Sequence, residues 1–320
     1  MPGVARFIGL AASILLALGS LKANAERITF ESVAPSTSAL EIFQGHAAYS
    51  DRIYGELRLP AKGSAPFPAM VIMHSSRGVD DTVLGWARLL NDMGIASFVV
   101  DSFTPRGLSQ ANASRLTWPA DVADTLRALR TLRTDARIEA SNIGVMGFSL
   151  GAIGAMEAGF ERYRAALVGI DGGKFAFHIV FYGGCSQYAK TTGSPILTFL
   201  GTKDDFNNVA VCRKYTELIN QQGTKAELVV YEGAPHEFDT DYPLQYMPMI
   251  QNSRNCAMLQ NLDTFEAMLV DGRALTPEER LHHSQSCRGS GASRGGDRRF
   301  VAPARERVRQ FVAEQFGLPR

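Results

Sequence analysis

Short apolar runs recur along most of this chain, and each ends in a polar or glycine-containing loop. One run alternates apolar and polar positions at residues 53–60, as a half-exposed strand does. The others are mostly apolar, which is typical of strands buried on both faces. They lie at residues 69–73, 95–100, 143–146, 177–182, 195–200 and 226–231.

Between these runs, apolar residues recur at the three- to four-residue spacing of helices. Such segments lie at residues 81–93, 120–132, 152–158, 209–222 and 302–316. Because strands and helices alternate, we predict an α/β fold with a mostly parallel sheet covered by helices on both faces. The loops that follow the strands then gather at one edge of the sheet, where α/β folds place their binding sites.

The alternation stops at residue 239 and resumes only in the last helix. Residues 242–299 contain clusters of Met, Asn, Gln, Arg and Gly, with short helices expected near 256–269 and 277–282. Residues 284–299 are rich in Gly, Ser and Arg, and we expect them to be mobile. We interpret about 240–300 as an insertion before the final helix. It is either a lid beside the site or a decorated surface loop.

The N-terminus has the pattern of a secretory signal peptide. One positive charge in residues 1–6 precedes an apolar stretch at 7–18, and Ala23-Asn24-Ala25 fits a cleavage site. The apolar stretch is too short to span a bilayer, so we expect no stable membrane anchor. We therefore predict an exported protein, periplasmic or secreted, with residues 26–320 forming a single domain.

Composition gives no support for a nucleic-acid partner and suggests disulfides. The net charge is +1, which gives no indication of nucleic-acid binding. The chain has four cysteines, and an even number in an oxidising compartment suggests two disulfides. Three pairings are possible. We favour Cys185–Cys212 and Cys256–Cys287, because each pair brackets one loop region.

The most informative motif is Gly147-Phe148-Ser149-Leu150-Gly151, which follows an apolar strand and opens a helix. In this context G-x-S-x-G predicts a nucleophile elbow, a tight strand-to-helix turn that presents the serine hydroxyl above the sheet. The alternative is an ordinary turn with a surface serine.

A serine nucleophile needs a base, and the base needs an acid that orients it. In this fold the order along the chain is Ser, then Asp or Glu, then His, and three residues at predicted strand ends supply it: Ser149, Asp204 and His236. Asp205 is the alternative acid, or it caps the next helix near Asn208.

An oxyanion hole requires two N–H donors near the nucleophile. We expect one from Leu150 and the other from Ser75 or Ser76, in the loop after the strand at 69–73. The neighbouring His74 is interpreted as structural, hydrogen-bonded within that loop.

Other polar residues near the predicted edge have simpler interpretations. Arg77 and Arg106 either form salt bridges between loops or hold an anionic substrate group. The pair His282-His283 has no visible third ligand, so we expect a solvated pair and no metal site.

Taken together, these motifs resemble the dienelactone hydrolase family of α/β-hydrolases. The resemblance covers roughly residues 54–238 and resumes in the last helix. It rests on GELRLP (55–60), FPAMVIMH (67–74), GVMGFSLG (144–151), GTKD (201–204) and PHEF (235–238). It implies the α/β-hydrolase fold and a hydrolase without cofactor that acts on esters or lactones through an acyl-enzyme. Two features depart from the founding enzymes, which are cytoplasmic and carry cysteine where this chain has Ser149.

We therefore predict an exported serine hydrolase that cleaves small to medium carboxylic esters or lactones. A peptidase or thioesterase with the same triad is one alternative, and a non-catalytic secreted binding protein is another. The sequence leaves the oligomeric state open.

Overall fold

A computed structural model describes residues 25–318. Its centre is an eight-stranded sheet of order β1-β2-β4-β3-β5-β6-β8-β9. β2 pairs antiparallel with β1 and β4, and all other neighbours are parallel. The bounds are β1 Glu26–Ser32, β2 Asp51–Arg58, β3 Phe67–Met73, β4 Ala96–Asp101, β5 Ile138–Phe148, β6 His178–Phe181, β8 Ile196–Lys203 and β9 Ala226–Pro235.

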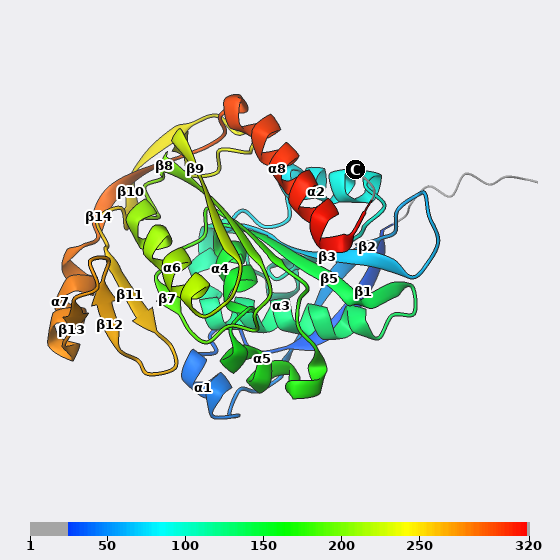
Figure 1. Cartoon of the computed structure of the whole chain (residues 1–320), viewed down its shortest axis with the longest axis horizontal. Helices are drawn as coiled ribbons and strands as arrows, with labels where there is room; N and C mark the ends of the chain where they lie inside the picture. The colour runs from blue at the N-terminus through cyan, green and yellow to red at the C-terminus, as the bar shows by residue number, and fades with distance from the viewer. Residues whose placement is uncertain (1–24, 319–320) are drawn as a thin grey trace, which may run out of the picture.

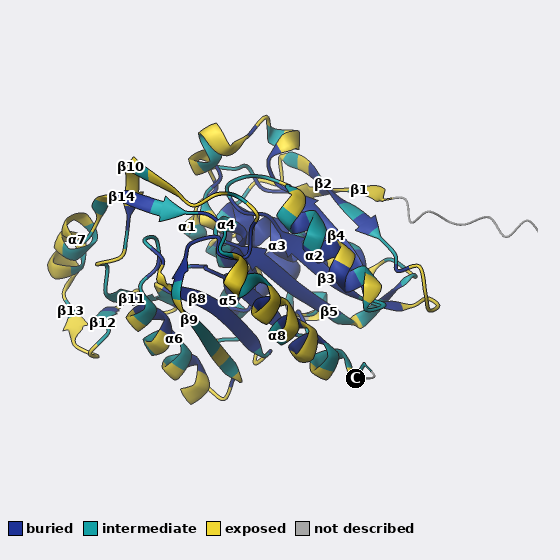
Figure 2. Ribbon diagram, turned by 90° about the horizontal axis from the view of Figure 1, so that it is seen from above, coloured by how far each residue is buried: buried dark blue, intermediate teal, exposed yellow. Residues whose placement is uncertain are grey.

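Helices cover both faces of this sheet (Figure 1). α2 and α8 lie on one face, with α3, α4 and α5 on the other, while α6 packs against β8 and β9. Their bounds are α2 Asp81–Asp92, α3 Trp118–Arg133, α4 Leu150–Glu157, α5 Glu161–Val168, α6 Val209–Gln221 and α8 Arg298–Phe316. The central strands are buried, as Figure 2 shows in dark blue. The predicted α/β architecture is confirmed.

Some elements of the fold were not predicted from the sequence. Strand β1, the short helix α1 (Ala39–Phe43) and helix α5 were not expected, and neither were the 3-10 turns η1 (Thr104–Arg106), η2 (Gln110–Arg115) and η3 (Ile170–Gly172). The predicted signal peptide lies outside the described residues except for Ala25. Among the residues that are described, no helix is both long and apolar enough to cross a membrane.

The segment between β9 and α8 is more regular than predicted. β10 (Gln245–Asn252) pairs antiparallel with β14 (Gly289–Arg294). A second small sheet of order β13-β12-β11-β7 contains β7 (Gln187–Tyr188), β11 (Met258–Asn261), β12 (Ala267–Leu269) and β13 (Ala274–Leu275). These strands and α7 (Pro277–Ser286) lie together at the β8–β9 end of the sheet (Figure 1).

Two predictions for this segment are wrong. Residues 256–269, expected as a helix, form the β11–β12 hairpin, which turns where the Asn261 side chain accepts the N–H groups of Asp263 and Thr264. The Gly/Ser/Arg-rich stretch 284–299, expected to be mobile, instead contains the end of α7, all of β14 and the start of α8. Pairing with β10 holds this stretch extended, whatever its own propensity.

Two disulfides tie this half of the molecule together. Cys185 bonds to Cys212, which links the loop after β6 to α6. Cys256 bonds to Cys287, which links the connection between β10 and β11 to the end of α7. These are the two pairings favoured by the sequence.

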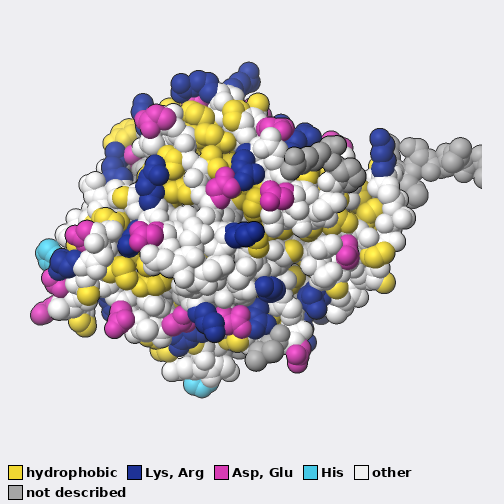
Figure 3. Space-filling model, in the orientation of Figure 1, with side chains coloured by type: hydrophobic (Ala, Val, Ile, Leu, Met, Phe, Trp, Pro, Cys, Tyr) yellow, Lys and Arg dark blue, Asp and Glu magenta, His cyan; other side chains and the backbone are white. Residues whose placement is uncertain are grey.

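On the face shown in Figure 3, acidic and basic side chains are interspersed. In the described part of the chain, this face offers no extended basic surface of the kind that binds a nucleic-acid backbone.

Candidate active site

Ser149 lies in the turn between β5 and α4, in a backbone conformation that L-residues rarely adopt (φ 52°, ψ −108°). The flanking positions must be glycine because a side chain there would overlap backbone atoms. A Cβ at Gly147 would lie 2.0 Å from the Gly151 carbonyl oxygen, and a Cβ at Gly151 would lie 2.5 Å from that of His74. The G-x-S-x-G pattern thus reflects close contact of strand, turn and helix, and such strain is typical of functional sites.

The structure brings Ser149, His236 and Asp204 into one hydrogen-bonded chain. The His236 Nε2 atom lies 2.9 Å from the Ser149 hydroxyl oxygen, and its Nδ1 lies 2.8 Å from Asp204 Oδ2. The three residues follow β5, β8 and β9 at the carboxyl edge of the sheet. Both His236 and Asp204 are buried. This geometry allows a proton to pass from the hydroxyl to the imidazole.

The loop after β8 holds Asp204 in place. Its Oδ1 accepts the N–H groups of Phe206 and Asn207 at 2.8 and 3.0 Å, and its Oδ2 accepts Asn207 Nδ2 at 3.1 Å. The Asn207 amide also donates to the Tyr182 carbonyl at 2.9 Å. These bonds fix the carboxylate in the orientation that contacts His236.

Asp205 faces the insertion instead. Its carboxylate accepts the N–H of Ser293 at 2.7 Å and pairs with Arg254 at 3.0 Å. The alternative that Asp205 caps the next helix is wrong, because the Asn208 side chain itself accepts Ala210 N–H at 2.9 Å. Adjacent acids therefore have separate tasks: one contacts His236, and the other holds the insertion.

Opposing effects set the basicity of His236. Burial lowers the pKa of its imidazole, but the charge and hydrogen bond of Asp204, together with the charge of Glu237, outweigh burial, so the pKa lies above the ordinary value. The His236 ring also packs edge-on against Tyr182, with the ring centroids 4.9 Å apart.

The candidate oxyanion donors come from the start of α4 and from the loop after β3. Leu150 and Ser76 line a common hollow, whereas Ser75 is buried and its hydroxyl oxygen accepts the N–H of Arg77. His74 donates from Nδ1 to the Ser75 carbonyl at 2.7 Å, and its Nε2 accepts the N–H of Ser102. His74 therefore stabilises the loop that contains Ser75 and Ser76.

Both arginines singled out in the sequence form salt bridges. Arg77 pairs with Glu237, next to His236, at 2.7 Å. Arg106 pairs with Asp51 and Asp124 at 2.6 and 2.7 Å. Their charges are used within the protein rather than offered to a ligand.

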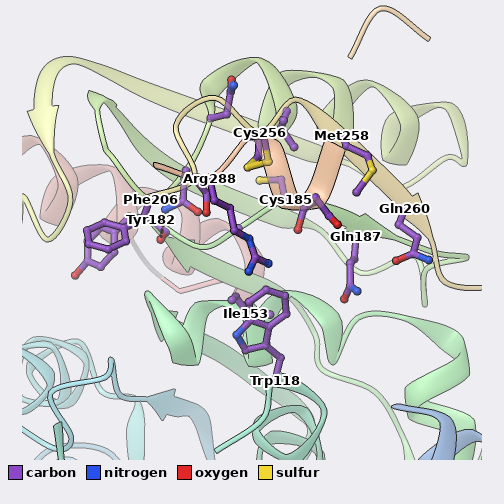
Figure 4. Close-up of a pocket in the computed structure, with 18 of the residues that line it drawn as sticks. Trp118, Ile153, Tyr182, Cys185, Gln187, Phe206, Cys256, Met258, Gln260 and Arg288 are labelled. Carbon is purple, nitrogen blue, oxygen red and sulfur yellow. Dashed lines mark hydrogen bonds between the residues drawn. A yellow bond between two sulfur atoms is a disulfide. The ribbon is translucent and has the colours of Figure 1, made fainter. Parts of the chain in front are cut away.

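A pocket of about 470 Å³ opens beside Ser149 and His236. Its wall on the core side comes from α3, α4, α6 and the loops after β6 and β8. The insertion forms the opposite wall, through Ser253, Cys256, Met258, Gln260, His283, Ser284, Cys287 and Arg288. In Figure 4, Arg288 extends from the insertion toward Trp118 and Ile153. Three of the four disulfide cysteines line this pocket, Cys185 among them.

Two further observations concern side chains in or near the pocket. His283 Nε2 accepts the N–H of Ala257 at 3.2 Å, and the described residues contain no group of three His, Cys, Asp or Glu side chains placed to hold a metal ion. Glu157, which the sequence analysis missed, also lines the pocket although it is only 3% exposed.

The model of the dienelactone hydrolase family matches residues 55–268. The chain belongs to this family. Its central sheet and helices are those of the α/β-hydrolase fold expected from the sequence, and its activity is that of a hydrolase of the ester or lactone type.

Individual relatives are distant. A probable 2-oxo-3-(5-oxofuran-2-ylidene)propanoate lactonase from Bradyrhizobium is 23% identical over 207 residues, which cover 58% of this chain and 79% of the relative. A solved putative dienelactone hydrolase from Klebsiella pneumoniae is similar at 16% identity, with a TM-score of 0.48 and coverage of 67% and 89%. The Thermogutta terrifontis esterase Est2 is similar at 16% identity, with a TM-score of 0.47 and coverage of 57% and 78%.

Proposed function

We propose that this hydrolase cleaves carboxylic esters or lactones with Ser149 as nucleophile, His236 as general base and Asp204 as the orienting acid. The observation that carries the proposal is the continuous chain of hydrogen bonds from the Ser149 hydroxyl through His236 to Asp204, at 2.9 and 2.8 Å. The position of Ser149 on the nucleophile elbow supports the same assignment.

In this mechanism, His236 Nε2 accepts the Ser149 proton while the hydroxyl oxygen attacks the substrate carbonyl carbon. The N–H group of Leu150 and that of Ser76 or Ser75 bind the resulting oxyanion, and Ser76 is favoured because it lines a hollow together with Leu150. His236 then gives the proton to the leaving alcohol. Water attacks the acyl-enzyme, and His236 again acts as base.

The pocket sets the size of the substrate. A volume of about 470 Å³ is within the range of small-molecule sites, which supports small to medium esters or lactones. The Bradyrhizobium relative is described as a probable lactonase, which supports lactones as substrates. The insertion at about 240–300 forms one wall of this pocket, so we assign it to substrate selection within a single domain spanning residues 26–320.

Labelling with a fluorophosphonate probe tests the nucleophile. The wild type is expected to be labelled and Ser149→Ala is not, while Ser64→Ala, an exposed serine just before β3, keeps full labelling. Labelling that persists in Ser149→Ala refutes the assignment. A folded wild type that takes no label indicates a binding protein. A panel of p-nitrophenyl esters, lactones, thioesters and peptide amides then separates the esterase from a thioesterase or peptidase.

We also propose that the protein is exported, with residues 1–25 removed. Disulfides persist in oxidising compartments, and the structure contains two of them. N-terminal sequencing of the protein from the periplasm or medium is expected to begin at Glu26. A cytoplasmic chain that retains residues 1–25 would contradict this.

A further inference from the structure

One face of α4 follows the pocket away from the nucleophile. Ser149, Ile153 and Glu157 are four residues apart, which places them on the same side of the helix, and all three line the pocket. Eight residues of helix rise about 12 Å. Glu157 therefore marks the far end of a channel that begins at the Ser149 hydroxyl.

The Glu157 carboxyl is buried, and one of its oxygens has no partner. The Oε2 atom makes no hydrogen bond within the described residues. Burying a carboxyl in this way costs stability, and native proteins rarely tolerate it outside functional sites. Burial raises the pKa of Glu157 to about 8. At neutral pH the carboxyl is therefore mostly protonated and retains an acceptor oxygen.

A second unpartnered group lies at the same end. Val211 of α6 lines the pocket, and one turn further along α6 the buried Tyr215 hydroxyl also lacks a hydrogen-bond partner among the described residues. Glu157 interacts electrostatically with Tyr215, and with Tyr163 of α5 and Asp121 of α3. None of these neighbours is a cation. The middle of the pocket is thus lined by Ile153 and Val211, and its end by a buried carboxyl that has an unpartnered oxygen and lies near Tyr215.

We propose that Glu157 is a substrate-recognition residue that binds a hydrogen-bond donor, a hydroxyl or an ammonium group, carried by the substrate about 12 Å from the bond being cleaved. This rests on the proposed function, because the distance is counted from Ser149 as nucleophile. The apolar middle of the pocket holds the chain between the two ends. The preferred substrate is therefore an ester or lactone with a polar donor at its far end.

The test compares esters of equal length that differ only in the end group: hydroxyl, ammonium or methyl. One series carries the end group on the acyl chain and the other carries it on the alcohol. A pH-indicator assay follows hydrolysis of both series by the wild type, Glu157→Leu, Glu157→Gln and the control Glu314→Leu, which removes an exposed carboxylate from α8.

In one series, the wild type is expected to prefer a donor end group over methyl. Glu157→Leu is expected to reduce that preference in kcat/KM by about tenfold, and Glu314→Leu leaves it unchanged. Glu157→Gln distinguishes the two donors. It keeps an acceptor oxygen, so a hydroxyl preference survives, but it cannot become an anion, so an ammonium preference is lost.

Removing an unpartnered carboxyl leaves the thermal midpoint of Glu157→Leu equal to or above that of the wild type. The proposal is overturned if the folded Glu157→Leu shows the wild-type ratio of donor to methyl esters in both series. Fluorophosphonate labelling separates this outcome from failure of the proposed function. Labelling of Ser149 in both proteins with unchanged ratios refutes only the role of Glu157, and no labelling of either refutes the hydrolase mechanism.

Discussion

Replacing Asp204 with asparagine changes one atom of the carboxylate and leaves its size unchanged. Asp204 Oδ1 accepts two backbone N–H groups, so an asparagine would keep its carbonyl oxygen there. Its NH₂ group would then replace Oδ2, the atom that faces His236 Nδ1 at 2.8 Å.

This substitution is expected to change the tautomer of the His236 imidazole. An NH₂ group donates to Nδ1, so the proton of neutral His236 moves to Nε2, where it faces the Ser149 hydroxyl. The imidazole can then no longer accept the Ser149 proton. A wrong tautomer in a serine–histidine–aspartate triad lowers kcat by about 10⁴, which corresponds to about 5 kcal/mol of transition-state stabilisation.

Hydrolysis of p-nitrophenyl acetate measures the effect, and Asp205→Asn is the matched control. Asp205 contacts Ser293 and Arg254 in the insertion rather than His236. Its asparagine variant is expected to change KM by weakening the pocket wall while kcat stays within about tenfold. The reasoning is refuted if folded Asp204→Asn retains activity within tenfold of the wild type, and the opposite ranking of the two variants would make Asp205 the acid.

Two further predictions follow from the site. Burial lowers the pKa of His236, but the charge and hydrogen bond of Asp204, together with the charge of Glu237, raise it further, so kcat/KM is expected to fall as the pH drops through a value above 6.5. Asp204→Asn removes the contribution of the Asp204 charge, so this limb of the pH profile moves to lower pH. An acid limb at the same pH in both proteins would contradict this. In urea unfolding, Gly147→Ala is expected to lose about 3 kcal/mol or more, because its Cβ would lie 2.0 Å from a backbone oxygen that no rotamer change can move. Gly85→Ala on α2, where a Cβ meets only arginine side-chain ends at 3.7 Å, is the control, and an equal loss in both would count against the close-contact argument.

The parts of the fold with local signals were predictable. Buried strands such as 69–73 are apolar throughout, and the elbow combines two glycines with a serine between a strand and a helix. The order Ser149, Asp204, His236 could be inferred because each residue comes shortly after a mostly apolar run. The choice between Asp204 and Asp205 could not be made with certainty, because it depends on which side chain the insertion engages.

The helix predicted within the insertion is absent for a physical reason. Met258, Leu259, Leu262, Phe265 and Leu269 have nearly helical spacing. The chain forms a hairpin instead, since Asn261 caps the turn, Phe265 adopts a positive φ of 63°, and β11 pairs with the distant β7. The pairing with β7 cannot be seen within a local window of the sequence.

Glu157 was missed for a similar reason. A glutamate at the end of a short helix normally indicates a solvent-exposed position. Its burial depends on the packing of α5 and α6, which come later in the chain, so no pattern near residue 157 identifies it.

The adjacency of Asp204 and Asp205 constrains any attempt to shorten this protein. Trimming the insertion to broaden access would remove Arg254, which neutralises the Asp205 charge, and the Ser293 N–H, which donates a hydrogen bond to it. An unpaired carboxylate would then remain next to Asp204, the proposed orienting acid, and it would make His236 hold its proton more tightly. A minimal version of this catalyst therefore needs a neutral residue at position 205 before the wall is removed.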